Sequence, residues 1–141
     1  MNCVTYNTTS ANTGCIECSA AYYVSANQCV ERVNKAIANC QTYVSNDDKC
    51  QTCATGKILS SDGKLCLNRI DKCATHEVFT ETKAQADLKC TTCEPLYYLA
   101  ADQKSCVLGT ITNCYKYQDG GSVCSECKDQ YVLDNNNTCT K

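Results

Sequence analysis

The sequence predicts a small disulfide-rich fold: four tandem two-disulfide repeats, stacked as an elongated rod, with short β-strand pairs, loops and little helix. Cysteine supplies 16 of the 141 residues, a fraction typical of disulfide scaffolds. Leucine, isoleucine, valine and phenylalanine number 8, 5, 9 and 1. A chain so poor in core-forming residues needs another source of stability. The third observation is the regular spacing of the cysteines.

The cysteines form four quartets with the spacing C–x(9–16)–C–x2–C–x(10–12)–C. The third residue after the first cysteine is tyrosine in three quartets and His76 in the other. Such self-similarity indicates a repeat array, with repeats at residues 1–36, 37–69, 70–110 and 111–141. The quartets are Cys3, Cys15, Cys18 and Cys29; Cys40, Cys50, Cys53 and Cys66; Cys73, Cys90, Cys93 and Cys106; and Cys114, Cys124, Cys127 and Cys139.

An aromatic or aliphatic triplet after each CxxC predicts a short strand. Ser, Asp, Asn and Gly between the triplet and the last cysteine predict a turn, most clearly at residues 60–63 and 134–137. The strand triplets are residues 22–24, 57–59, 97–99 and 131–133.

Two segments have helical spacing. Val30, Val33 and Ile37 fall on one face in the link between the first two repeats. The third repeat carries an insertion at residues 80–89, in which Ala84 and Leu88 share a face and Thr80 is a candidate cap.

Aliphatic residues flank the quartets, and we expect them to pack the joints between neighbouring repeats. Three isoleucines precede quartets and three further aliphatic residues follow them. They are Ile37, Ile70 and Ile111, and Val30, Leu67 and Val107.

Disulfides within each quartet are the expected chemistry of the cysteines. Joining the two cysteines of CxxC gives a tight ring typical of labile redox sites. Two pairings remain: first-to-third with second-to-fourth, or first-to-second with third-to-fourth. Each bridge contributes about 3 kcal/mol in the loop-entropy model, so the bridges specify the fold more than a core does. Zinc is the rival interpretation, but a four-thiolate site typically uses two CxxC pairs, and each quartet has one.

Charge and residue types argue against several function classes. The net charge is −2 and no basic run occurs, which argues against nucleic acid as a partner. No apolar stretch reaches about 18 residues, which argues against direct membrane insertion. His76 is the only histidine, and no nucleophile or carboxylate pair accompanies it. Because it stands where the other repeats have tyrosine, we expect it to be a structural side chain of the repeat rather than a catalytic base. We therefore expect no enzymatic activity, no catalytic residues, no cofactor and no metal.

The cysteine content indicates an oxidising compartment, hence an extracellular or cell-surface location. Cys3 lies too close to Met1 for a signal peptide to precede it, and the last residues form no apolar tail for a lipid anchor. We expect any signal and anchor to lie outside this sequence. Asn7 and Asn136 begin two N-glycosylation sequons in expected loops, and N-glycans are expected there if the sequons are used.

The unit C–x–x–Tyr…CxxC–x3–Tyr-Tyr-Leu…C resembles the furin-like, growth-factor-receptor type of cysteine-rich repeat. The abundance of Asn and Thr resembles the versions arrayed in ciliate and other protist surface proteins, such as immobilisation antigens. The resemblance covers the whole chain and implies the first-to-third, second-to-fourth pairing. In this sequence that pairing is Cys3–Cys18, Cys15–Cys29, Cys40–Cys53, Cys50–Cys66, Cys73–Cys93, Cys90–Cys106, Cys114–Cys127 and Cys124–Cys139.

These features predict a structural, surface-coat segment whose partners are neighbouring repeats of a longer array or other copies. Contacts between copies would run head-to-tail and build a fibre. A ligand- or receptor-binding module is the alternative, and Phe79 with the insertion at 80–89 is its candidate site. A zinc-binding CxxC protein is the third hypothesis.

Overall fold

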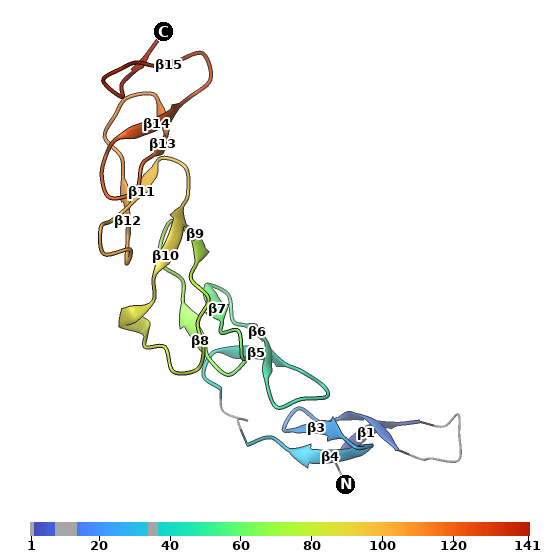
Figure 1. The fold of residues 1–141 in the computed structure, drawn as a ribbon. Coiled ribbons are helices and arrows are strands. Elements are labelled where there is room, and N and C mark those ends of the chain that lie inside the picture. The colour runs from blue at the N-terminus through green and yellow to red at the C-terminus, as the bar shows by residue number, and fades with distance from the viewer. Residues whose placement is uncertain (1, 8–13, 34–36) are drawn as a thin grey trace. The chain divides into compact units, whose positions relative to one another are not determined.

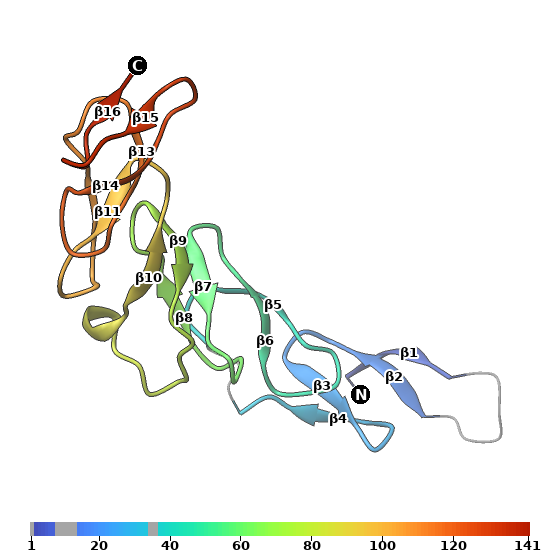
Figure 2. The same cartoon turned by 45° about the horizontal axis from the view of Figure 1, so that its top comes forward.

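The computed structural model describes residues 2–7, 14–33 and 37–141. Within these ranges it contains eight two-stranded antiparallel sheets and one turn of 3-10 helix. Each odd-numbered strand pairs with the next strand along the chain; Figure 1 shows most of these hairpins, and Figure 2 also labels β2 and β16. Two hairpins per repeat and almost no helix confirm the predicted disulfide-rich repeat fold.

The first hairpin of each repeat joins a strand that begins at the first cysteine to the strand formed by CxxC. The first cysteine faces the third across this ladder, as Cys3 faces Cys18. These pairs are β1 (Cys3–Tyr6) with β2 (Cys15–Cys18), β5 (Cys40–Tyr43) with β6 (Cys50–Cys53), β9 (Cys73–His76) with β10 (Cys90–Cys93), and β13 (Cys114–Tyr117) with β14 (Cys124–Cys127).

The second hairpin joins the triplet after CxxC to the strand that holds the last cysteine, which confirms the predicted strands. These pairs are β3 (Tyr22–Ser25) with β4 (Gln28–Glu31), β7 (Lys57–Leu59) with β8 (Cys66–Asn68), β11 (Tyr97–Leu99) with β12 (Cys106–Leu108), and β15 (Val132–Leu133) with β16 (Cys139–Thr140).

The predicted turn ends in a residue of left-handed backbone that ties the two hairpins together. Asn27, Gly63 and Gln103 have φ of 64°, 72° and 62°. Their carbonyl oxygens accept the backbone N–H of the second cysteine in their repeats, at 2.8, 2.7 and 2.8 Å. Only glycine adopts this conformation without steric cost, and asparagine tolerates it better than most residues. The composition of the turn thus follows from its backbone.

Each first hairpin carries a bulged residue on both strands. The ladder skips one residue after the first cysteine and one after the second. All eight of these residues are solvent-exposed, because a bulge turns its side chain away from the paired ladder. They are Val4 and Ile16, Gln41 and Gln51, Ala74 and Thr91, and Tyr115 and Ser125.

The disulfides join the first cysteine to the second and the third to the fourth, so the pairing implied by the resemblance is wrong. The eight bridges have Cα–Cα distances of 5.7 to 5.9 Å. In a straight ladder Cys3 and Cys15 would lie about 10 Å apart along the strands. The bulges on both strands twist the hairpin, so the two cysteines come close enough to form a disulfide. The bridges are Cys3–Cys15, Cys18–Cys29, Cys40–Cys50, Cys53–Cys66, Cys73–Cys90, Cys93–Cys106, Cys114–Cys124 and Cys127–Cys139.

The helices expected from spacing do not form in the described residues. Val30 lies in β4, where pairing with Tyr23 overrides its helical spacing, and residues 34–36 lie outside the described residues. In the insertion only η1 (Gln85–Asp87) is helical. It starts after Ala84, with no side-chain cap, so Thr80 does not cap it.

The chain divides into two compact units. The first comprises residues 1–68 and 79–82, and the second residues 69–78 and 83–141. Each unit therefore holds two repeats, apart from residue 69 and the four residues 79–82. The predicted rod stays a prediction. No helix of the described residues has the length and apolarity to cross a membrane.

Sulfur forms the centre of each repeat. The second cysteines, Cys15, Cys50, Cys90 and Cys124, are 4, 2, 0 and 0% exposed. Among the described residues, the buried apolar side chains other than cysteine are Leu67, Phe79, Leu88 and Leu99. Leu99 packs on Cys73 and Cys90, with Ile70 beside them. So few apolar contacts leave the bridges as the main stabilising element.

Candidate functional site at the joints between repeats

The sulfur clusters are the first place to look for chemistry. In each repeat the Sγ atoms of three cysteines lie within 4.8 Å of one another, close enough for a shared metal ion. All sixteen cysteines are bridged, however, and none is free. A metal needs thiolates, which a disulfide does not offer. The CxxC cysteines are not joined to each other, so the tight redox ring is also absent from this chain.

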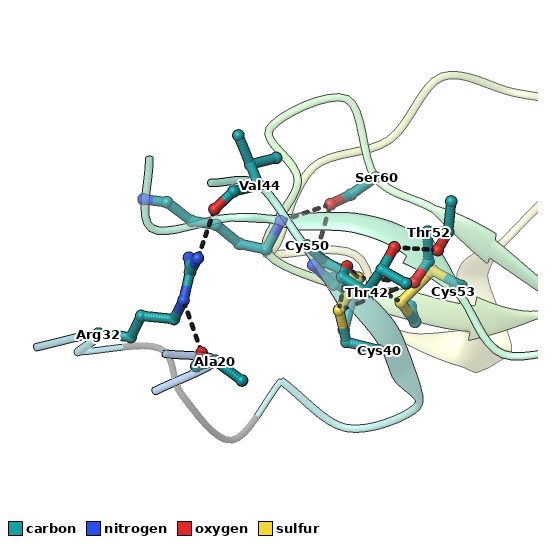
Figure 3. Close-up of a disulfide and its surroundings, with 12 residues drawn as sticks. Ala20, Arg32, Cys40, Thr42, Val44, Cys50, Thr52, Cys53 and Ser60 are labelled. Atoms are coloured by element: carbon teal, nitrogen blue, oxygen red, sulfur yellow. Dashed lines mark hydrogen bonds between the residues drawn. A yellow bond between two sulfur atoms is a disulfide. The ribbon is translucent and has the colours of Figure 1, made fainter. Parts of the chain in front are cut away.

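Arg32 holds the first two repeats together, within the first unit. It follows β4, and its side chain is buried, with 3% of the residue exposed. Its Nε donates to the carbonyl oxygen of Ala20 at 3.0 Å and its guanidinium also donates to the carbonyls of Asp47 and Val44. Figure 3 shows the side chain reaching from Ala20 to Val44. One residue thus satisfies backbone carbonyls of both repeats.

Two tyrosines complete this joint. The guanidinium carbon of Arg32 lies 5.8 Å from the ring centre of Tyr23 and 5.0 Å from that of Tyr43. Such cation–π contacts favour arginine because its guanidinium is flat and weakly hydrated. Beside them the Val24 N–H donates to the carbonyl of Ser45 at 2.8 Å, so backbone as well as side chains crosses the joint.

The joint between the third and fourth repeats uses the same positions with different residues. Gly109 occupies the place of Arg32, three residues after the last cysteine. A Cβ atom on Gly109 would lie 1.9 Å from the Tyr117 ring, so that ring fills the space that an arginine would need. The Tyr98 and Tyr117 rings lie 6.3 Å apart, and Gly120 donates its N–H to the Leu99 carbonyl at 2.7 Å.

Tyr117 and His76 perform one structural task at the same register position. The Tyr117 hydroxyl accepts the Ile111 N–H at 3.1 Å and donates to the Ile111 carbonyl at 3.0 Å. His76 accepts the Ile70 N–H on Nε2 at 2.9 Å. The structure thus gives His76 the repeat-register role that the sequence predicts.

The environment of His76 favours its neutral form. Partial burial, followed by the positive charge of Arg69, holds the pKa of His76 below its usual value. Arg69 donates to the carbonyl of Cys73 at 3.0 Å, which keeps it near the ring. A protonated Nε2 would lose the lone pair that accepts from Ile70, so this contact requires neutral histidine.

Phe79, the aromatic residue of the candidate binding site, is buried, although most residues of the insertion at 80–89 are exposed. Its carbonyl accepts from both the N–H and the hydroxyl of Ser61, at 2.8 and 3.0 Å. Asp62 accepts the Glu81 N–H at 2.9 Å. The Ser60 hydroxyl, and then backbone N–H groups, hold the pKa of Asp62 below its usual value. Residues 79–82 therefore fasten onto the turn of the second repeat.

The aliphatic residues predicted at the joints are only partly involved. Leu67 is buried, but Val30 and Val107 are each 40% exposed. Ile70 packs on the sulfur cluster of its own repeat, and Ile111 holds Tyr117 through its backbone. The prediction that these aliphatics pack between repeats is wrong for Val30 and Val107, because arginine, tyrosine and backbone hydrogen bonds make the contacts instead.

A groove of about 540 Å³ lies on the second unit. Pro95 and Leu96 line one part, Tyr115 and Glu126 another, and residues 127–129 the rest. The Leu96 N–H donates to the Tyr115 carbonyl at 2.8 Å and so joins its two sides. Sequence reasoning missed this groove, although Pro95 is the only proline and Tyr115 stands where the other repeats have Val4, Gln41 and Ala74.

The two sequon asparagines lie in loops. Asn136 is exposed in the last turn, where Asp134 accepts the N–H groups of Asn136 and Thr138 at 2.9 and 2.8 Å. Asn7 is half-buried and donates its N–H to the Gly14 carbonyl at 2.9 Å. The remaining residues of its sequon, Thr8 and Thr9, lie outside the described residues.

Comparison with known proteins gives no relative: no family model, curated protein or solved structure matches the chain.

Replacing Arg32 with alanine should loosen the first joint. The change removes hydrogen bonds to carbonyls on both repeats and leaves those carbonyls unpaired. The free energy of unfolding should fall by about 2–4 kcal/mol, as measured by urea unfolding of the oxidised chain. Hydrogen exchange at the Val24 amide should speed up in parallel. Arg69→Ala removes the one partly buried hydrogen bond of an exposed side chain and should cost less than about 1 kcal/mol. Equal effects would contradict the role given to Arg32.

Replacing Gly109 with alanine should destabilise the second unit by steric overlap. The added methyl group meets the Tyr117 ring, and overpacking of this kind costs about 1–3 kcal/mol. Gly121→Ala is the matched control, because no atom lies within 4 Å of its Cβ position. Urea unfolding should separate the two variants clearly. A Gly109→Ala protein as stable as the control would refute the close approach of Tyr117.

The stability of the second unit should depend on the protonation of His76. Its pKa is lower when folded than when unfolded, so its contribution is complete above the ordinary value of about 6.5 and declines as pH falls through the lowered value. His76→Tyr should remove this component, since tyrosine stays neutral and already serves at this register in Tyr117. Urea unfolding across a pH series tests it. Identical pH profiles for wild type and variant would contradict the assignment.

Proposed function

We propose that the chain is a structural, non-enzymatic segment of an extracellular or cell-surface protein, of the kind that builds a surface coat. One observation carries this proposal: the side chains best suited to chemistry are all engaged in structural contacts. The cysteines are bridged, Arg32 binds carbonyls across a joint, and His76 binds its own backbone neighbour. Disulfides on this scale also suit an oxidising compartment.

The partner proposed is a repeat of the same kind on another copy. Leu99 and Leu133 occupy the same register, yet Leu99 is 3% exposed and Leu133 is 37% exposed. Leu99 lies at a joint where its carbonyl accepts from Gly120 of the following repeat. Val24, also at this register, bonds to Ser45 of the following repeat. The register that hydrogen-bonds to the following repeat at two internal joints is therefore the surface that a further repeat fits.

The first repeat presents the complementary side. Tyr6 stands in the register of Tyr43 and Tyr117, which make ring contacts at the internal joints, and it is 42% exposed. A joint between Leu133 of one copy and Tyr6 of the next joins unlike surfaces. Such head-to-tail contacts propagate as a fibre unless they close into a ring.

Ligand binding is the second candidate, and the groove beside Tyr115 favours it. Tyr115 and Leu96 are 38 and 37% exposed there, and Glu126 and Lys128 also line the groove. A concave surface that combines apolar and polar side chains is typical of binding sites. The resemblance to furin-like repeats supports a binding role only loosely, since the disulfide pairing of this chain differs from the pairing that the resemblance implies.

Self-association should depend on Leu133. Sedimentation velocity of the oxidised chain over a wide concentration range should show concentration-dependent growth, and Leu133→Asp should abolish it by placing a charge in the contact. Leu108→Asp is the matched control, because Leu108 is also an exposed strand residue but lies outside the joint register. A wild-type chain that stays monomeric at every concentration would refute the head-to-tail contact.

The coat role itself is tested by location. Antibodies raised against the folded, oxidised chain should label intact, non-permeabilised cells of the source organism or their shed coat. Labelling that appears only after permeabilisation would refute the coat role. The labelling result does not depend on Leu133 or on self-association. Surface location and head-to-tail contact are therefore tested separately.

A further inference from the structure

In every repeat the two disulfides touch each other. The Sγ atoms of the second and fourth cysteines belong to different bridges, yet they lie 3.3, 3.8, 3.6 and 3.5 Å apart in the four repeats in order. The contact is shortest in the first repeat, between Cys15 and Cys29. A thiolate released at Cys15 would therefore lie directly against a sulfur of the neighbouring bridge.

The other two cysteines are also placed to pair. Cys3 and Cys18 are direct partners across the ladder of β1 and β2, and facing residues in an antiparallel pair have Cα atoms about 4.5–5.5 Å apart. That range lies within the span of a disulfide. One backbone thus brings together the sulfur pairs of two arrangements: Cys3–Cys15 with Cys18–Cys29, and Cys3–Cys18 with Cys15–Cys29.

We propose that the first repeat is a thiol–disulfide exchange site at which an external thiol catalyses the rearrangement of the two disulfides. The thiolate attacks Sγ of Cys3, a mixed disulfide forms, and the Cys3–Cys15 bond breaks with its electron pair on Cys15. The Cys15 thiolate attacks Sγ of Cys29, so the Cys15–Cys29 bond forms and Cys18 leaves as a thiolate.

Cys18 then completes the cycle. It attacks Sγ of Cys3, forms the Cys3–Cys18 bond and releases the external thiolate unchanged. Three bonds form and three break, with no net oxidation, so the thiol acts as a catalyst. The mixed disulfide on Cys3 is also a covalent intermediate, through which a thiol of a small molecule or a protein attaches to the chain.

Access distinguishes the first repeat from the last two. Cys3 is partly exposed, whereas the equivalent Cys73 and Cys114 are 1 and 2% exposed. An external thiolate reaches an exposed sulfur directly, but a buried one only after local opening of the structure. Leu99 further covers the bridge of the third repeat. The second repeat shares the access, since Cys40 is partly exposed, but its sulfur contact is 3.8 Å rather than 3.3 Å.

The natural glutamates allow the exchange to be read directly. Glu17 separates Cys15 from Cys18, Glu31 follows Cys29, and Glu126 separates Cys124 from Cys127. After cleavage at glutamate, the first-to-second pairing leaves peptides 1–17 and 18–31 unlinked. The exchanged pairing joins them covalently. In the fourth repeat, cleavage after Glu126 releases peptide 127–141 if the first-to-second pairing is present. The exchanged pairing keeps this peptide linked to the rest of the chain.

The experiment treats the full oxidised chain with substoichiometric glutathione at mildly alkaline pH. Acid quenching, alkylation, unfolding and cleavage at glutamate follow, with detection by mass spectrometry. Linked 1–17 and 18–31 should accumulate with no change in the mass of the intact chain. Linkage of 127–141 should appear at least about tenfold more slowly, because Cys114 needs local opening.

Two outcomes would overturn the proposal. Peptides 1–17 and 18–31 that stay unlinked at every time would show that the sulfur contact in the first repeat supports no exchange. Equal rates in the first and fourth repeats would show scrambling through general unfolding. Neither outcome bears on surface location or self-association, so this inference stands apart from the proposed function.

Discussion

The structure depends on one constraint: in every repeat one disulfide closes the first hairpin and a second joins that hairpin to the next one. An isolated two-stranded hairpin is marginally stable in water, and the apolar side chains of this chain are too few to bury it. The bridges supply the missing stability by limiting the unfolded chain, and the buried second cysteine gives each repeat its centre. Every other contact then has only to set one repeat against the next.

Those contacts show that a repeat preserves its backbone more strictly than its side chains. The residue after the third cysteine donates its N–H to the residue before the first cysteine in all four repeats. At the joints, by contrast, arginine and glycine occupy one position, and tyrosine and histidine another. A neighbouring group compensates for each difference in residue type. Tyr117 fills the space beside Gly109, and the ring nitrogen of His76 takes the place of the tyrosine hydroxyl. The same repeat backbone thus supports joints that use different side chains.

The sequence revealed features that repeat, and it concealed those that depend on a single contact through space. Four aligned registers were enough to predict the strand triplets, the turns and the role of His76. The disulfide pairing depends on bulges that coil each hairpin, and spacing alone does not encode them. The burial of Arg32 was hidden because a charged residue is ordinarily exposed, and its carbonyl partners lie 12 to 15 residues away. Phe79 looked exposed because its docking turn belongs to the preceding repeat.

The bulged positions have a consequence for how such a protein diversifies. In every repeat two exposed side chains project from the first hairpin, which a disulfide closes, as Val4 and Ile16 do. Their replacements in the other repeats range from glutamine to tyrosine, although the backbone beneath is the same. Substitution there is nearly without cost to folding, since exposed positions tolerate change. A scaffold of this kind can therefore alter the chemistry of its exposed face while its framework stays constant.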